Sequence, residues 1–187
     1  MKKILFQLFM FSALLSNAQA PTQLPEPDKS PLDICYFPVN YPLLKIQDQI
    51  KEPPVARVIY SRPKKEGRPV FGNLVEYGKL WRLGANEATE IEFFRPVTIA
   101  GKKIAKGRYT LFAIVNEKNW TLIVNKDTDV WGSFRYNKAK DLVRIEVPVK
   151  KMEEPTELLS MTFEKTNNRL NLIIAWETTR VELPILL

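Results

Sequence analysis

Apolar and polar residues alternate with a period of two through the last quarter of the chain. The alternation is clearest over residues 143–149 and recurs over 159–164, 170–177 and 181–185. Successive side chains of a β-strand point to opposite faces of the sheet, so this period indicates strands with one buried face. The dipeptide 167–168 is Asn-Asn, and asparagine tolerates the positive φ of a tight hairpin turn. The pattern therefore predicts a hairpin between the second and third of these runs.

Two earlier runs, 109–115 and 120–124, are apolar at nearly every position and are joined by the polar segment 116–119. A strand that is apolar on both faces is covered on both sides, so these two are expected in the interior of a sheet. Shorter strands are expected over 97–99 and 102–104. Many short strands with turn residues between them predict an all-β fold, mainly antiparallel, of the β-sandwich or jelly-roll type. The strand order does not follow from the sequence.

Helix is expected in only one or two short segments. Residues 73–80 can form one or two turns that end at Gly78, and residues 138–142 are the second candidate. Pro38 and Pro42 interrupt the aromatic segment 36–42. Because proline has no N–H to offer a neighbouring strand, an irregular edge segment is expected there.

The first twenty residues have the parts of a secretory signal peptide. Lys2 and Lys3 form the positive start, residues 4–15 form an apolar run, and residues 18–20 (Ala-Gln-Ala) offer a cleavage site. The apolar run is too short to span a bilayer, which takes about 20 residues. We therefore expect an exported protein, in the periplasm or outside the cell, with no stable membrane insertion after cleavage.

Beyond this signal peptide (1–20), residues 21–33 hold four prolines and predict an extended lead-in. The remainder, 34–187, has the length of a single domain with a sizeable core. Without residues 1–20 the chain carries 26 Lys and Arg against 21 Asp and Glu, a net charge of +5. This modest and dispersed charge favours attraction to anionic envelope surfaces, and we expect no nucleic acid as a partner.

The composition excludes several kinds of catalytic site. The sequence has no histidine and one cysteine, Cys35, so a Ser-His-Asp triad, a His-ligated zinc site and an intramolecular disulfide are impossible. No glycine-rich nucleotide-binding motif follows a strand. The apolar neighbours of Cys35 indicate a small buried side chain. We expect no cofactor and no metal.

Residues with recognition chemistry concentrate between positions 60 and 89. Four of the seven glycines lie between Gly67 and Gly84, which indicates a tightly wound backbone with positive-φ corners. Rigid loops that present arginine and aromatic side chains are typical of recognition surfaces. The candidate ligand-binding residues are Arg62, Trp81, Arg82, Asn86, Glu87 and, from a later motif, Trp131.

Each of these residue types has two interpretations. The planar guanidinium of Arg82 can clamp a carboxylate or phosphate, or it can pair with Glu87 and lock the loop. Glu87 can serve as a general base or metal ligand if its environment perturbs it. Asn86 can hydrogen-bond a ligand or its own turn. Trp81 can stack on a sugar ring or fill the core. An open cleft shared with Trp131 would favour a site, whereas mutual bonding would favour a structural clasp.

A second motif, 125–132, places oxygen donors at Asn125, Asp127 and Asp129, like the opening of a calcium loop. Such a loop needs glycine at its sixth position and glutamate at its twelfth, and here these are Val130 and Tyr136. A turn that uses Asp and Asn for its own backbone bonds is the favoured interpretation.

Four stretches of the chain resemble one family of exported proteins from Gram-negative bacteria, domain of unknown function 2911. They are GRPVFGNLVEYGKLWRLGANEAT, IAGKKIAKGRYTLFAI, NWTLIVNKDTDVWG and SPLDICYFPVNYP. The resemblance covers nearly all of the chain after residue 20. It implies an exported protein with a β fold, and it implies no reaction because the family has no assigned activity.

Three functions follow as hypotheses. The favoured one is a non-enzymatic module that binds a small molecule, a glycan or an envelope partner through residues 61–87. The second is a hydrolase that uses Glu87 with another carboxylate, while Arg82 orients the substrate; the other acids in motif-rich regions are Glu76, Asp127 and Asp129. The third is a structural component of the envelope.

Overall fold

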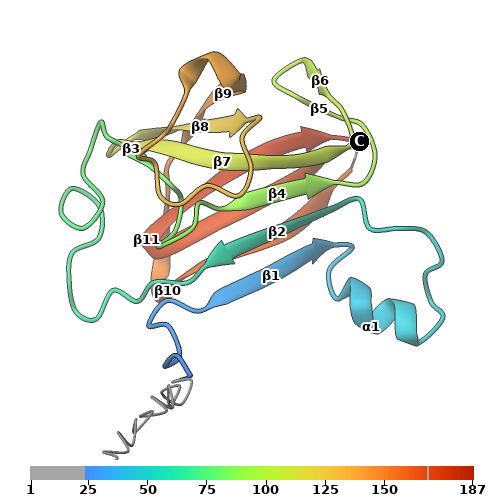
Figure 1. Cartoon of the computed structure of the whole chain (residues 1–187), viewed down its shortest axis with the longest axis horizontal. Coiled ribbons are helices and arrows are strands. Elements are labelled where there is room, and N and C mark those ends of the chain that lie inside the picture. Colours follow the sequence, from blue (N-terminus) through green and yellow to red (C-terminus); the bar gives the residue numbers. More distant parts are fainter. Residues whose placement is uncertain (1–23, 168) are drawn as a thin grey trace, which may run out of the picture.

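The computed structural model describes residues 24–167 and 169–187. These residues form eleven strands, one α-helix and one 3-10 helix, and the strands lie in two antiparallel sheets packed against each other (Figure 1). The predicted all-β, mainly antiparallel fold class is confirmed. The signal peptide predicted for residues 1–20 lies outside the described residues. Within the described ranges, no helix has the length and apolar character needed to cross a bilayer.

The first sheet contains the strands predicted to be interior. Its strands, in spatial order, are β1 (Leu32–Phe37), β2 (Ala56–Ser61), β4 (Glu90–Phe93), β7 (Gly107–Val115), β8 (Asn119–Asn125) and β9 (Asp141–Pro148), and β3 (Leu80–Trp81) pairs with β7 outside this order. Strands β7 and β8 each have neighbours on both sides, as their continuous apolar sequences predicted.

The second sheet contains most of the alternating runs. Its order is β10 (Lys150–Thr166), β11 (Arg169–Leu186), β5 (Val97–Ile99) and β6 (Lys102–Ile104). The runs 170–177 and 181–185 are parts of one strand, β11, which pairs with β10 around Asn167 at φ 48°. The positive φ agrees with the turn predicted for asparagine at this position.

The helix predictions were partly wrong. Residues 138–142 contain the 3-10 helix η1 (Lys138–Lys140), but residues 73–80 form turns instead of a helix. Here Gly72 N donates to Val75 O and Val75 N donates to Val70 O, and neither bond has the i→i−4 spacing of an α-helix. The α-helix α1 (Tyr41–Ile46) instead follows edge strand β1, where an irregular segment was expected, with a proline in its first turn.

Both sheets contribute side chains to one core, and aromatic residues gather at one end of it. We call four residues the aromatic cluster: Phe71, Trp81, Trp120 and Trp176. Five of the six ring pairs among them have centroids 5.0–6.2 Å apart. They come from the β2–β3 connection, β3, β8 and β11. The cluster therefore joins the two sheets to the connecting segment at the left end of the sandwich in Figure 1.

The β2–β3 connection, residues 62–79, is attached to both sheets. Lys65 N donates to Glu157 O and Leu159 N donates to Pro63 O, which fixes one part of the connection to β10. At its other end, Gly78 N donates to Val115 O of β7. These bonds hold the glycine-rich segment across the end of the sandwich.

Candidate functional site

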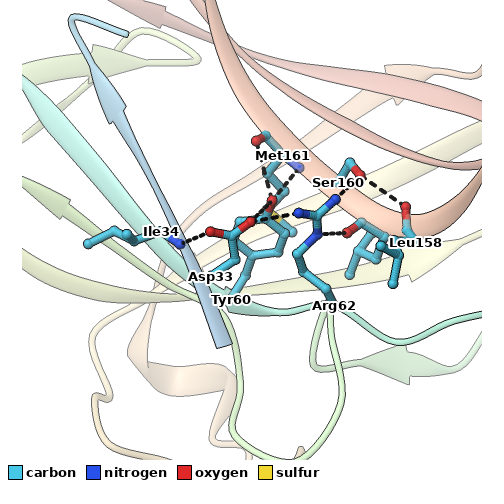
Figure 2. A network of polar contacts seen from close by, with 8 residues as sticks. Asp33, Ile34, Tyr60, Arg62, Leu158, Ser160 and Met161 are labelled. Carbon is cyan, nitrogen blue, oxygen red and sulfur yellow. Dashed lines mark hydrogen bonds and ion pairs between the residues drawn. The ribbon is translucent and has the colours of Figure 1, made fainter. Parts of the chain in front are cut away.

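Arg62 belongs to a polar network that joins β1, β2 and β10 (Figure 2). Its Nη1 lies 2.8 Å from Asp33 Oδ2, its Nε donates to Leu159 O at 3.2 Å, and its Nη2 donates to Ser160 Oγ at 2.9 Å. Tyr60 adds a hydrogen bond from Met161 N to its hydroxyl oxygen at 3.0 Å. All three nitrogens of the Arg62 guanidinium thus have protein partners, and the network ties the edge of one sheet to the other sheet.

Trp81 is buried in the aromatic cluster. Its indole stacks on Trp176, with centroids 6.1 Å apart and planes 22° apart, and its Nε1 donates to Gly84 O at 3.0 Å. The Trp81 side chain is only 7% exposed, so a sugar ring has almost no access to its face. Its role in the fold is to fill the core.

Arg82 is half-buried and forms no ion pair with Glu87 in the described structure. It lines a cavity of about 240 Å³ together with Arg68, Trp81 and Trp176, which we call the arginine cavity. Glu87 is exposed and lines a different cavity, beside Arg108. The clasp expected between Arg82 and Glu87 is therefore not formed.

Asn86, Glu87 and Trp131 lie together on a separate part of the surface. Asn86 adopts a left-handed backbone at φ 56°, and its carbonyl accepts a hydrogen bond from Gly132 N at 2.9 Å. Glu87 forms an isolated β-bridge with Trp131. Trp131 is 60% exposed. The structure brings these three candidates together and separates them from Arg62, Trp81 and Arg82, which line no common cavity with them.

The acids of the second motif are paired with cations. Asp127 Oδ1 lies 2.5 Å from Lys140 Nζ, and Asp129 Oδ1 lies 2.5 Å from Arg108 Nη2. Arg108 also pairs with Glu90. The hydrogen bond from Arg108, with a smaller contribution from Thr128, lowers the pKa of Asp129 below its usual value. The described residues contain no group of three or more His, Cys, Asp or Glu side chains arranged as metal ligands. Both aspartates serve ion pairs on the protein surface.

Cys35 of β1 is expected to react slowly with thiol reagents. Burial, with a smaller contribution from Asp33, raises the pKa of its thiol to about 12, so the nucleophilic thiolate is scarce at neutral pH. Labelling with iodoacetamide at pH 8 should be at least tenfold slower than for the urea-unfolded chain, and the difference should shrink as pH rises toward 12. Equal labelling rates for folded and unfolded protein would contradict this expectation.

A cavity of about 450 Å³ in the described structure has an aromatic side. We call it the main cavity. Phe71, Tyr77 and Trp120 line this side, and Tyr77 is 40% exposed while Trp120 is buried. The ring of Tyr77 packs against the backbone of Gly72. Phe71 and Tyr77 both come from the β2–β3 connection, the segment that the sequence singled out.

The other side of the main cavity is charged. Glu117 and Lys118 come from the β7–β8 hairpin, Lys151 comes from the start of β10, and Glu177 comes from β11. None of these four side chains forms an ion pair with another described residue. The cavity therefore presents carboxylates and ammonium groups without ion-pair partners among the described residues, next to exposed aromatic surface.

Glu177 has an unusual backbone for a strand residue. Its φ is 54°, and β10 bulges opposite it, with register shifts on both sides of the Thr156–Glu177 pair. Bulges redirect side chains and are common beside binding sites. Here the Glu177 carboxylate accepts a hydrogen bond from Val70 N at 3.4 Å and lines the main cavity. The pKa of the Tyr77 hydroxyl is raised, mainly by burial and further by the negative charges of Glu117 and Glu177.

Sequence reasoning found part of this site. Phe71 and Tyr77 lie within the segment 60–89 that the sequence singled out, but none of the six candidate side chains lines the main cavity of the described structure. Glu117 and Glu177 were missed because they lie far apart in the chain. The one sequence signal for Glu177 was its polar position at the end of the alternating run 170–177, directly after Trp176.

A family model described as "Protein of unknown function (DUF2911)" matches residues 42–185. The chain belongs to the DUF2911 family. The match to DUF2911 spans the β2–β3 connection and every residue that lines the main cavity. No curated protein and no solved structure matches the chain.

Proposed function

We propose that this DUF2911 protein is an exported, non-enzymatic binding module that holds a small polyhydroxylated ligand, such as a glycan unit, in the main cavity. Export rests on the signal-peptide pattern of residues 1–20. The ligand class rests on one observation: an exposed aromatic ring, Tyr77, shares a cavity with carboxylates and ammonium groups that have no ion-pair partner.

The chemistry of a sugar matches the two sides of this cavity. A sugar ring has apolar C–H faces, which pack on aromatic rings, and an equatorial belt of hydroxyls. Carboxylates such as Glu117 and Glu177 accept hydrogen bonds from hydroxyls, and Lys118 and Lys151 donate to them. The volume of about 450 Å³ lies within the range of small-molecule sites.

Isothermal titration calorimetry of the purified protein with a panel of neutral and amino sugars and their short oligomers tests for binding. We expect a Kd of about 0.1–1 mM for the best single unit, since an affinity of about 4–5.5 kcal/mol is common for so small a ligand. Tyr77→Ala should weaken binding at least tenfold, and the near-isosteric Glu177→Gln should weaken it about threefold to tenfold.

Trp131→Ala is the matched control, because Trp131 is also an exposed aromatic residue but lies outside the main cavity. It should leave the sugar affinity unchanged. If Trp131→Ala abolishes binding while Tyr77→Ala does not, the ligand lies on the surface of Asn86 and Glu87, and the proposal is wrong. If the parent protein releases cleaved sugar and the Glu177→Gln variant does not, the protein is a hydrolase and the binding-module proposal is wrong.

A further inference from the structure

Arg82 differs from the other partly buried arginines of the described structure. Arg57, Arg62 and Arg180 each lie within 2.8 Å of a carboxylate oxygen. Arg82, buried to a similar degree, has no carboxylate partner among the described residues. A cation that leaves water without an opposite charge loses hydration without compensation, so this arrangement carries a free-energy cost.

The guanidinium of Arg82 also lacks neutral partners. Its Nε atom is buried and makes no hydrogen bond to any residue that the structure describes. The cation–π contacts of residues 24–167 and 169–187 involve Lys45 and Arg57, so no aromatic face compensates Arg82. Burial lowers the pKa of the Arg82 side chain, which reflects the same uncompensated desolvation. A buried donor without a partner in a native structure calls for an explanation.

A second guanidinium lines the same cavity. Arg68 is held in place by two hydrogen bonds, from its Nε to Lys65 O at 2.9 Å and from its Nη2 to Lys64 O at 2.8 Å. Among the described residues, no acidic side chain lines the arginine cavity; its remaining lining is apolar or small, including Ser30 and Gly84. Arg68 Nη2 also lies 3.5 Å from Glu66 Oε2, so Arg82 is the guanidinium of this cavity that has no carboxylate partner among the described residues, and it gives the cavity a positive potential.

We propose that the arginine cavity is a binding site for an oxyanion group, either a phosphate ester or a carboxylate of a small ligand, with Arg82 as its main contact. An oxyanion supplies acceptors for the unused Arg82 donors and neutralises the Arg82 charge, while Arg68, which lines the same cavity, adds a second guanidinium nearby. The volume of about 240 Å³ accommodates such a group with part of the molecule that carries it. The site is separate from the main cavity, and the inference stands without the proposed glycan function.

Inorganic phosphate and acetate are suitable probes, because they carry the two candidate groups alone. Titration of the full protein with phosphate should shift the ¹⁵N–¹H resonance of Arg82 Nε and raise the Tm, with a Kd in the millimolar range. A positively charged site attracts a dianion more strongly than a monoanion, so acetate should bind at least fivefold more weakly if the ligand group is a phosphate. Acetate binding as tight as that of phosphate would assign a carboxylate instead.

Arg82→Gln separates binding from stability. It should weaken phosphate binding at least tenfold, while the Tm of the unliganded variant stays equal to that of the parent or rises, because an uncompensated cation has been removed. Arg95→Gln is the matched control: Arg95 is exposed, has no ion-pair partner among the described residues and lies outside the cavity. It should leave phosphate binding unchanged.

Two outcomes would overturn the proposal. A clearly lower Tm for unliganded Arg82→Gln, together with no response of the parent protein to either anion, would give Arg82 a structural role. An equal loss of phosphate binding in Arg95→Gln would show that the response comes from the general surface charge and not from the arginine cavity. Tyr77→Ala should leave the phosphate response intact, so a failure of the glycan proposal is distinguishable from a failure of this one.

Discussion

Trp81→Ala is expected to lower the free energy of unfolding by about 3–5 kcal/mol, as for other buried aromatic residues cut back to alanine. The substitution removes three ring contacts with the aromatic cluster and the hydrogen bond from Nε1 to Gly84 O. The loss is a large fraction of the stability of a typical domain, which is about 5–15 kcal/mol. Urea denaturation followed by circular dichroism measures it.

Trp131→Ala is the control for this measurement, since the same side chain is removed from a position that is 60% exposed. It should change the free energy of unfolding by less than about 1 kcal/mol, as is usual for surface positions. Similar losses for both variants would contradict the assignment of Trp81 to the core and of Trp131 to the surface.

Gly72→Ala is expected to destabilise the protein by about 2–5 kcal/mol, because two costs add. Gly72 has a φ of 85°, a conformation that costs an L-residue about 1–2 kcal/mol. An added Cβ would also lie 2.7 Å from the ring of Tyr77, and such overpacking costs about 1–3 kcal/mol. The displaced Tyr77 ring should weaken ligand binding in the main cavity as well. Chemical denaturation measures the first effect and calorimetry the second.

Gly67 offers a matched control for the backbone cost alone. Its φ is 74°, and a Cβ there would meet no atom within 4 Å. Gly67→Ala should therefore cost only about 1–2 kcal/mol. In the Gly72→Ala/Tyr77→Ala double variant the ring that the added Cβ would meet is absent, so the steric cost should disappear. The loss of unfolding free energy should then be smaller than the sum of the losses in the two single variants. Additive losses would show that Tyr77 does not pack on Gly72.

The local part of the fold was predictable from the sequence. Alternation along 143–149 and the apolar runs 109–115 and 120–124 identified β9, β7 and β8, because each pattern depends only on which faces of a strand are buried. The position of β4 between β2 and β7 was not predictable. Strand partners are chosen by packing between distant segments, and no residue within β4 specifies its neighbours.

The site was harder to predict because residue type does not report what a side chain already contacts. Arg62 and Trp81 have the chemistry of ligand-binding residues, but the fold uses both for its own contacts. Arg82 has the same chemistry and remains unpaired, a difference that only the three-dimensional arrangement reveals. Glu177 reaches the main cavity through a bulge in β10 opposite it, which the period of two along β11 cannot indicate.

The placement of the indole rings has a consequence for spectroscopy. Three of the four tryptophans lie in the aromatic cluster, with Trp81 5.9 Å from Trp120 and 6.1 Å from Trp176. At such separations the excited states of the rings couple, so the folded chain carries its own optical probe in the near-ultraviolet. Trp120 faces the main cavity, and Trp81 and Trp176 face the arginine cavity. Occupancy of either cavity can therefore be followed by light absorption and emission, without an attached dye.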